Sequence, residues 1–427
     1  MERTLIGDLA GKKGEAVLIQ GWVSVRRDQG KMVFFDFRDR SGVVQGVTLP
    51  ASAAIETAKE VRNEYVVAVE GKVNERPEKN RKEGAQNGDI ELEVTGITII
   101  SKSEIPFELG TEVNLDTYLD HMPFTLRTEK AKQIFKTQEA IIAGFREGMK
   151  GQGFTEFQAP ALVGGDAEGG ASAFEVDYYY DKKAFLATSP QFYKQIMVGV
   201  FERAFATPKV FRGEKHATTR HLSEYSSLDF EMGFIKDHTD VMAALEHTMR
   251  LIVQKAGVEV AMPTKIPVLK LREVQKILGV AEEPDLEPEH ERAICEWALK
   301  EHNSDFVFVT HYPVSKRPFY TYEDENDKGF TKSFDLLFRG LEITTGGQRV
   351  HNHDELVERM KAKGLKPELF SYYLQAFKVG LPPHGGSATG LERLTARLLN
   401  LPNVKEATLF PRDLNRIDTL LSTDKKG

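Results

Sequence analysis

Residues 210–234 read VFRGEKHATTRHLSEYSSLDFEMGF, and both ends of this stretch have the alternation of a β-strand. Successive side chains of a strand point to opposite faces, so Arg212 and Glu214 share a face of the first arm, as Asp229 and Glu231 do in the second. An antiparallel pair of these arms has one apolar face for a core and one face with four charges, which predicts a polar or charged ligand. The alternative is a surface hairpin whose charges are only solvated.

The loop between the two arms is rich in hydrogen-bond donors. Cationic, imidazole and hydroxyl side chains occur at Lys215, His216, Thr218, Thr219, Arg220 and His221. Donors of this kind bind phosphate oxygens, so the loop predicts a polyanionic ligand.

Composition limits the class of protein. The chain has 427 residues, 41% of them hydrophobic and 28% charged, so we expect a soluble protein with two domains. No apolar run approaches the roughly 20 residues of a membrane-spanning helix, and the first residues lack the hydrophobic segment of a signal peptide. The single cysteine, Cys295, excludes an internal disulfide and a cysteine metal cluster. A cytoplasmic protein is therefore expected, and its net charge of -7 restricts any nucleic-acid contact to a local patch.

Residues 15–100 contain five strand-like segments, with a helix-like piece at 52–63 after the third. This is the layout of an OB-fold barrel, whose exposed face binds oligonucleotides, so residues 1–104 are predicted to form such a domain. Cations, aromatics and an amide suited to unstacked bases lie on or near that face at Arg26, Arg27, Phe34, Phe35, Arg38 and Gln45. In the alternative arrangement, Phe35 and Phe37 fill the barrel and the arginines are solvated.

A connector and a second domain follow the barrel. Residues 105–126 have few periodic apolar positions and are predicted to link the barrel to a domain at 127–427. Apolar residues then recur at helical spacing over residues 127–150. The next segment, GFTEFQAPALV, is typical of a strand that is stopped by Pro160.

Another helix is predicted to begin near residue 190. Ser189 can cap this helix, with Pro190 at its first position. Gln191 and Lys194 are three residues apart, so they share one face of the opening turns. The alternative to a binding role is that both side chains are solvated.

Residues 332–352, KSFDLLFRGLEITTGGQRVHN, predict a second hairpin. If residues 339–340 form its two-residue turn, Leu337 lies opposite Glu342, and Asp335 is on the same face as both. The two carboxylates are then diagonal neighbours, close enough to share a divalent cation with phosphate oxygens.

The segment 380–394, GLPPHGGSATGLERL, runs from a glycine-rich strand into a helix that bears Glu392 and Arg393. Its two glycines at P-loop spacing are followed by Leu-Glu in place of Lys-Ser or Lys-Thr, so the segment is not a P-loop. Glycines in such a strand let a ligand approach the backbone closely.

These segments, in this order, resemble class II aminoacyl-tRNA synthetases, and among them the aspartyl type with an N-terminal OB-fold. GFTEFQAPALV, FRGEKHATTRHLSEYSSLDFE and GSATGLERL are similar to the three motifs of the class, and GWVSVRRDQGKMVFFDFRDRSGVVQ is similar to the anticodon-binding barrel. SPQFYKQ and GLEITTGGQRVH favour aspartate over asparagine and lysine. The resemblance covers nearly the whole chain. It implies an α+β fold, with a five-stranded barrel and a catalytic domain whose antiparallel sheet is flanked by helices.

The resemblance implies a ligase that joins L-aspartate to tRNA through aspartyl-adenylate, with ATP as a substrate and Mg²⁺ as cofactor. Arg212 and Arg393 would be catalytic, with Arg212 on the α-phosphate of ATP. The ATP-binding residues would be Arg212, Glu214, Arg220, His221, Glu342 and Arg393. The Mg²⁺ carboxylates would be Asp335 and Glu342.

The same resemblance assigns the amino acid, tRNA and dimer contacts. Arg349 would clamp the side-chain carboxylate of aspartate. The other aspartate-binding residues would be Glu168, Gln191, Lys194 and Asp229. The anticodon contacts would be Arg27, Phe34 and Gln45 in the barrel. The first motif implies a homodimer, with Pro160 at its interface.

Specificity stays open at this point. The span of residues 234–335 is too short for the large extra domain of the bacterial enzymes, so the chain resembles the compact archaeal and eukaryotic form. Some compact enzymes charge only tRNA-Asp and others also charge tRNA-Asn. Two alternatives are an enzyme that passes aspartyl-adenylate to ammonia and an inactive RNA-binding paralogue. The barrel argues against the first, and the intact Arg212, Arg393, Asp335 and Glu342 argue against the second.

Overall fold

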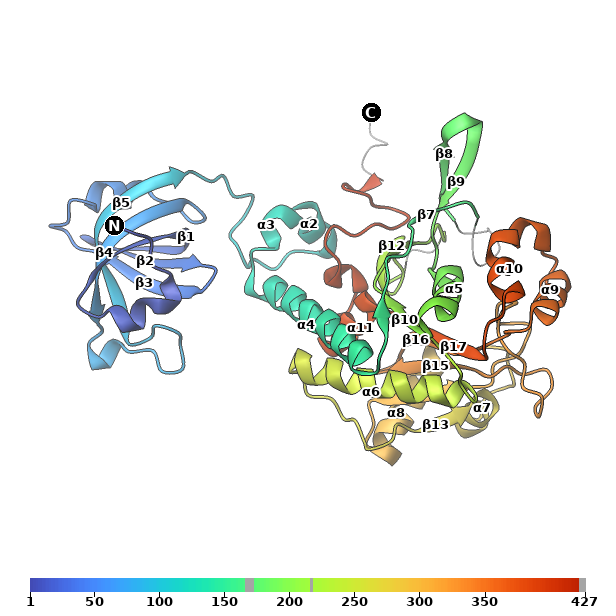
Figure 1. Ribbon diagram of the computed structural model, residues 1–427. Helices are drawn as coiled ribbons and strands as arrows, with labels where there is room; N and C mark the ends of the chain where they lie inside the picture. Colours follow the sequence, from blue (N-terminus) through green and yellow to red (C-terminus); the bar gives the residue numbers. More distant parts are fainter. Residues whose placement is uncertain (166–172, 216–217, 422–427) are drawn as a thin grey trace. The chain divides into compact units, whose positions relative to one another are not determined.

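The computed structural model describes residues 1–165, 173–215 and 218–421 (Figure 1), and the chain forms two compact units, residues 1–111 and 112–427. The predicted Glu168 and His216 lie outside the described residues. Among the described residues, no helix is long and apolar enough to cross a membrane.

The first unit is a closed barrel of five strands in the order β1-β2-β3-β5-β4, as expected for an OB-fold. A short helix, α1, lies between β3 and β4, where the sequence predicts it. The strands and the helix are β1 (Ala16–Gln29), β2 (Met32–Asp39), β3 (Gly42–Thr48), α1 (Ile55–Glu60), β4 (Val66–Glu75) and β5 (Ile90–Ser101).

The barrel interior corrects the predicted nucleic-acid face. Phe35 is fully buried and stacks on Phe37, with ring centroids 5.1 Å apart, so both rings belong to the core. Arg38 is buried as well, because its two terminal nitrogens donate to the carboxylate of Glu64 at 2.5 and 2.7 Å. Of the two arrangements open to the sequence, the one with Phe35 and Phe37 inside the barrel is therefore right. Arg38 is neither on an exposed nucleic-acid-binding face nor solvated, so both environments expected for it are wrong.

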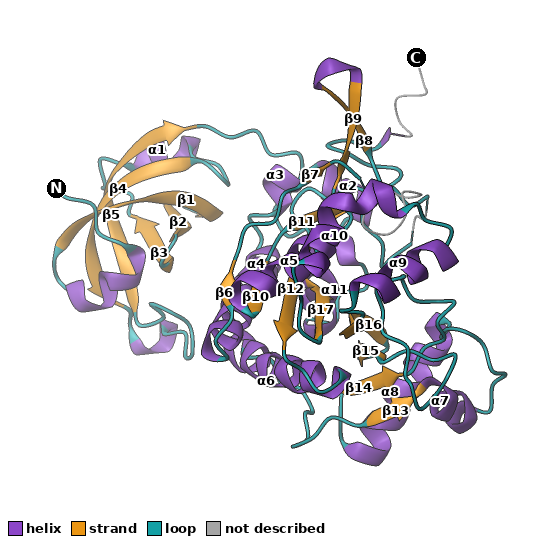
Figure 2. Ribbon diagram, turned by 45° about the vertical axis from the view of Figure 1, so that its right-hand side comes forward, coloured by secondary structure: helices purple, strands orange, loops and turns teal. Residues whose placement is uncertain are grey.

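The second unit is built on a nine-stranded sheet with the order β13-β14-β15-β16-β17-β12-β10-β6, and with β11 paired to β12 (Figure 2). Neighbouring strands are antiparallel except for the pairs β13–β14 and β10–β6 at the two edges. The strands are β6 (Thr155–Glu156), β10 (Arg203–Ala206), β11 (Lys209–Phe211), β12 (Glu224–Gly233), β13 (Val268–Lys270), β14 (Phe306–Thr310), β15 (Ser333–Phe338), β16 (Leu341–Arg349) and β17 (His384–Gly390). A small separate sheet contains β7 (Leu162–Val163), β8 (Glu175–Tyr178) and β9 (Lys182–Leu186).

Helices flank the large sheet (Figure 2). The two longest, α4 and α6, pack closely because glycines face the partner helix: a Cβ atom on Gly144 would lie 2.8 Å from the Cα of Ile252. The helices are α4 (Glu129–Gly151), α5 (Gln191–Phe201), α6 (His238–Ala256), α7 (Leu271–Leu278), α8 (Pro288–His302), α9 (His353–Ala362), α10 (Ser371–Lys378) and α11 (Leu391–Leu398). Short 3-10 helices are η1 (Ile6–Lys12), η2 (Glu78–Asn80), η3 (Tyr179–Asp181), η4 (Pro367–Phe370) and η5 (Val404–Ala407).

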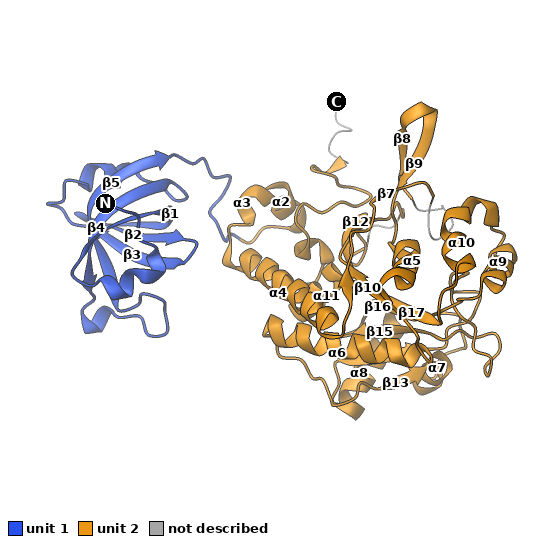
Figure 3. Cartoon of the chain, viewed as in Figure 1, with its two compact units in different colours: residues 1–111 blue, residues 112–427 orange. Residues whose placement is uncertain are grey.

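Two predicted segments differ from the structure. The strand expected before Pro160 is reduced to two residues, because β6 pairs only with the edge of β10 and the chain then leaves the sheet for β7. The stretch 105–126, predicted as a connector, contains the short helices α2 (Leu115–Asp120) and α3 (Met122–Thr125), which fall in the second unit (Figure 3). The side chain of Asn114 caps α2.

Candidate active site

A cavity of about 410 Å³ lies in the second unit, over one face of the large sheet. Its wall combines α5 with residues from β12, β16 and β17 and from the loop after β11. Nine residues with predicted site roles line it: Gln191, Lys194, Arg212, Glu214, Arg220, His221, Glu342, Arg349 and Arg393. Asp229 and Asp335 lie beside it without lining it.

Arginines gather at one end of the cavity. The Arg393 guanidinium donates to the backbone oxygen of Glu342 at 3.2 Å and lies 3.3 Å from the carboxylate of the same residue. Arg220 is held by Glu291, with 2.9 Å between Nη2 and Oε1. Arg212 lies 3.7 Å from Glu214. Three guanidinium groups at one end of the cavity provide donors for the oxygens of a polyphosphate.

The first hairpin is confirmed, although its first arm is shorter than expected. β11 and β12 are antiparallel, but β11 ends at Phe211, so Arg212 and Glu214 lie just beyond the strand. The Arg212 backbone N–H still donates to Ser223 O at 2.8 Å, which keeps this side chain at the mouth of the hairpin. On β12, Leu228 joins the hydrophobic core.

The other end of the cavity holds a buried charge cluster on the face of β12 that the alternation predicts. Lys194 Nζ lies 2.9 Å from Asp229 Oδ1 and 3.5 Å from Glu231 Oε2. Arg349 Nε donates to Glu231 Oε1 at 3.0 Å, and its Nη2 donates to Gly386 O at 2.9 Å. Lys194 is 1% exposed and Arg349 5%, so both cations are preorganised and nearly desolvated. The sequence places Glu231 on this face but predicts no site role for it.

A hydrogen-bond chain supports the cluster from behind. Gln191 Nε2 donates to Gln195 Oε1 at 3.0 Å, and the hydroxyl of Tyr373 donates to the same oxygen at 2.9 Å. Gln195 Nε2 lies 2.8 Å from Nε2 of His384, whose Nδ1 lies 2.9 Å from Pro382 O. Burial lowers the pKa of His384 to about 4, so the ring is neutral, with Nδ1–H as donor and Nε2 as acceptor. The sequence offers one signal for this chain, the spacing of four between the two glutamines.

The start of α5 differs slightly from its prediction. The helix begins at Gln191, one residue later than expected, with Pro190 in the capping position. Ser189 still contributes, because its Oγ accepts a hydrogen bond from the Gln191 N–H at 3.2 Å. Gln191 is 4% exposed, so the alternative of a solvated helix start is wrong.

The second hairpin has the predicted turn and one irregularity. Leu337 lies opposite Glu342, as expected, but a bulge after Leu336 places Asp335 opposite Thr345. Burial raises the pKa of Asp335 to about 6. Burial also opposes ionisation of Glu342, but the charge of Arg393 and other donors outweigh it and lower the pKa of Glu342.

Two observations bear on a metal at this hairpin. Asp335 Oδ2 accepts from Arg317 at 2.8 Å, while its buried Oδ1 has no hydrogen-bond partner among the described residues. Within the same described ranges, no group of three or more His, Cys, Asp and Glu side chains is placed to hold a metal. Two carboxylates with a spare oxygen fit Mg²⁺, which takes one or two protein carboxylates and completes its shell with water and phosphate oxygens.

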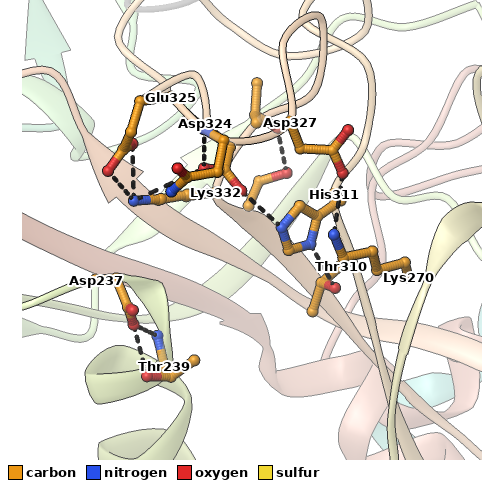
Figure 4. A network of polar contacts seen from close by, with 12 residues as sticks. Asp237, Thr239, Lys270, Thr310, His311, Asp324, Glu325, Asp327 and Lys332 are labelled. Carbon is orange, nitrogen blue, oxygen red and sulfur yellow. Dashed lines mark hydrogen bonds and ion pairs between the residues drawn. The ribbon is translucent and has the colours of Figure 1, made fainter.

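One wall of the cavity is the segment between β14 and β15, which carries Arg317 and Tyr320. Figure 4 shows the polar network that fixes its base. There His311 Nε2 lies 3.2 Å from Asp324 Oδ2, and burial lowers the pKa of this histidine. Ion pairs of Lys270 with Asp327 at 3.0 Å and of Lys332 with Glu325 at 2.9 Å complete the network. The wall is thus tied to β13 through Lys270 and to β14 through Thr310, whose Oγ1 lies 2.8 Å from His311 Nδ1.

The barrel keeps three predicted residues together on its outer face. Arg27 lies opposite Phe34 on β2, and Gln45 lies opposite Asp36. The guanidinium of Arg27 is bidentate on Asp36, at 2.9 and 3.0 Å. Arg27, Phe34 and Gln45 are all partly exposed. An aromatic ring beside a cation and an amide forms a surface on which a base can stack.

Glu392 is a buried carboxylate at the edge of the cavity. Both of its oxygens accept from the Ser226 N–H at 3.0 Å, and burial raises its pKa from 4.5 to about 7. Because the folded-state pKa lies above the unfolded value, the folded protein binds this proton more tightly, and stability is lost as pH rises from 4.5 to about 7.

Glu392→Gln should remove this part of the pH dependence. Between pH 5 and pH 8 we expect the wild type to lose up to roughly 3 kcal/mol more unfolding free energy than the variant. Urea unfolding of both proteins at the two pH values measures the difference. Glu296→Gln, at an exposed position on α8, is the matched control and should keep the wild-type slope. The same slope for Glu392→Gln would show that this carboxyl is ionised throughout.

A largely antiparallel sheet with an arginine-lined cavity, carried on a chain that also has an OB-fold barrel, is typical of a class II aminoacyl-tRNA synthetase. Residues 114–414 match the family model described as tRNA synthetases class II (D, K and N), and residues 17–100 match that of the OB-fold nucleic acid binding domain. The chain belongs to this D, K and N family of class II synthetases, so the predicted fold class and family are confirmed.

Similar proteins cover nearly the whole chain. The aspartate-tRNA(Asp/Asn) ligase of Thermus thermophilus is 45% identical over 442 residues, which is 97% of this chain and 99% of the relative. The aspartate-tRNA(Asp) ligase of Thermococcus kodakarensis is 36% identical and covers 95% of this chain and 96% of its own. Among solved structures, asparaginyl-tRNA synthetase from Pyrococcus horikoshii complexed with asparaginyl-adenylate has a TM-score of 0.89 at 31% identity, covering 98% of this chain and 99% of that one.

Proposed function

We propose that this chain attaches L-aspartate to tRNA, with ATP as the second substrate and aspartyl-adenylate as the intermediate. The observation that carries the proposal is the pair of buried cations, Lys194 and Arg349, at one end of the cavity. Two desolvated cations suit a side-chain carboxylate, which only accepts hydrogen bonds. The NH₂ group of an asparagine side chain would face the N–H donors of Lys194 and Arg349, and the ammonium group of a lysine substrate would be repelled by both cations.

The carboxylates of the cluster suit the α-ammonium group of the amino acid. Asp229 Oδ2 is a buried acceptor without a hydrogen-bond partner among the described residues, and Glu231 Oε2 has only the ion pair with Lys194 at 3.5 Å. A buried unpaired carboxylate oxygen is costly, and an ammonium donor would satisfy it. Asp229 is therefore proposed to receive the α-amino group, with Glu168 beside it and Gln191 lining the pocket.

Positioning and electrostatics account for the chemistry of the first step. The α-carboxylate of aspartate attacks the α-phosphorus of ATP in line, and pyrophosphate leaves. Arg212 would stabilise the charge on the α-phosphate, while Arg220, His221 and Arg393 bind the remaining phosphates and Glu214 lies near the adenine. Asp335 and Glu342 would hold Mg²⁺, which supplies positive charge for the phosphate oxygens when bound. No protein group has to transfer a proton in this step.

In the second step the terminal adenosine hydroxyl of tRNA takes the aspartyl group. The barrel would hold the anticodon through Arg27, Phe34 and Gln45. We further propose a cytoplasmic homodimer with Pro160, an exposed residue, at its interface.

Charging of two tRNA transcripts tests the proposal. Purified chain, radiolabelled aspartate and either tRNA-Asp or tRNA-Asn are combined at one fixed salt concentration, since nucleic-acid affinity depends on salt. We expect tRNA-Asp to be charged. Comparable charging of tRNA-Asn would define a relaxed enzyme, and its absence a strict one. Aspartate-dependent ATP–pyrophosphate exchange without charging of either tRNA would contradict the tRNA part of the proposal.

A further inference from the structure

A second cavity of about 490 Å³ adjoins the candidate active site in the same unit. It lies between the start of α8, the turn joining β15 to β16, and the end of α11. Arg220, His221 and Val404 line both cavities, so the two share a wall at the arginine-rich end of the active site.

The second cavity carries uncompensated positive charge. Of its cations, Lys316 is paired with Asp285 at 2.9 Å and Arg220 with Glu291. Arg292 and Arg397 also line it, and neither side chain makes a hydrogen bond or ion pair with any residue in the part of the chain that the structure describes.

The electrostatic surroundings of Arg397 in the second cavity affect its pKa. Burial lowers the pKa of the Arg397 guanidinium; Cys295 and Glu291 oppose this shift, and repulsion from Arg220 and Arg292 adds to it. Arg397 is half-buried among other arginines, and the nearby carboxylate of Glu291 is already paired with Arg220, which favours an anion between the arginines. The acidic lining residues Asp285 and Glu287 are occupied, the first by Lys316 and the second by capping α8.

We propose that this second cavity binds the inorganic pyrophosphate released in the first step. The inference rests on the proposed function. As the aspartate carboxylate bonds to the α-phosphorus, the bond from that phosphorus to the bridging oxygen breaks, and the electron pair leaves with pyrophosphate. Arg220 stands at the wall that the two cavities share, held by the buried Glu291, and so can contact the anion in either cavity. Arg292 and Arg397 are the groups that receive it.

Neutral variants of the two unpaired arginines test this site. Arg397→Gln and Arg292→Gln are compared with Lys300→Gln, an exposed lysine on α8 whose loss changes net charge equally. For each full-length protein we measure the dissociation constant of inorganic pyrophosphate alone by calorimetry, and the KM for pyrophosphate in ATP formation from aspartyl-adenylate. Each arginine variant should weaken both constants about tenfold, as expected for one charge-assisted contact. The KM for ATP should change much less, and Lys300→Gln should match the wild type.

Further outcomes separate the alternatives. Arg292→Lys keeps the charge and should restore most of the pyrophosphate affinity. Unchanged pyrophosphate constants in both Gln variants would overturn the proposal, and so would an equal loss of ATP affinity, which would place these arginines on ATP itself. A raised KM for tRNA alone would overturn it in favour of a tRNA phosphate. If the wild type showed no aspartate-dependent ATP–pyrophosphate exchange, the proposed function would be refuted. Calorimetry with pyrophosphate would still test binding to the second cavity, so the two failures can be told apart.

Discussion

Arg349→Ala is expected to abolish aspartate activation while ATP binding is mostly retained. The guanidinium of Arg349 is buried, donates to Glu231 and lines the pocket proposed for the aspartate side chain. Removing a desolvated charge partner costs roughly 3–5 kcal/mol, which corresponds to a loss of roughly 10²- to 10⁴-fold in kcat/KM for aspartate. Aspartate-dependent ATP–pyrophosphate exchange measures that loss, and calorimetry with ATP measures nucleotide affinity.

The variant also leaves Glu231 without its arginine partner, so stability has to be separated from binding. Arg349→Lys, which keeps a cation but loses the fork of donors, serves as the first control. Arg359→Ala, at a partly exposed arginine on α9, serves as the second and should retain full exchange activity. An intact thermal transition with lost exchange supports a binding role. Equal losses of aspartate and ATP affinity would place Arg349 on the nucleotide instead.

Local pattern predicts the faces of the site strands well. Alternation places Asp229 and Glu231 on one side of β12 and its apolar residues in the core on the other side, because successive side chains of a strand point to opposite faces. The turn of the second hairpin is predicted too. The bulge after Leu336 is not, since an extra residue in β16 leaves no mark in the composition of the strand. The bulge changes the residue opposite Asp335 from the one that regular pairing would give.

Contacts between distant segments account for what the sequence does not predict. His384 and Gln195 are 189 residues apart, yet their side chains meet behind the pocket. Glu291 on α8 reaches both Arg220 and the backbone N–H of Glu342, and the sequence predicts no site role for it. In the barrel, alternation divides Phe34 from Phe35 correctly, but it does not say which side is closed. The buried partner of Arg38 lies after α1, where no local pattern points to it.

Arg212→Ala should slow adenylate formation more than any other change in the phosphate end of the cavity. Arg212 lies at the end of β11 with its guanidinium 5.8 Å from the ring centroid of Tyr225, and its side chain is 35% exposed. A guanidinium on the α-phosphate acts where charge develops in the transition state, so we expect kcat for pyrophosphate exchange to fall roughly 10³-fold. Rapid-quench measurement of aspartyl-adenylate formation at saturating ATP and aspartate gives the rate of this step.

The exposure of Arg212 makes this experiment cleaner than the one at Arg349. Glu214, 3.7 Å from Arg212, is itself partly exposed, so losing this pair should hardly change the melting temperature. Arg212→Lys keeps the charge without the planar fork and should recover only part of the rate, because the lysine is a point charge. If Arg212→Ala raised the KM for ATP and left kcat unchanged, the guanidinium would bind ground state and transition state equally, and its place on the α-phosphate would be refuted.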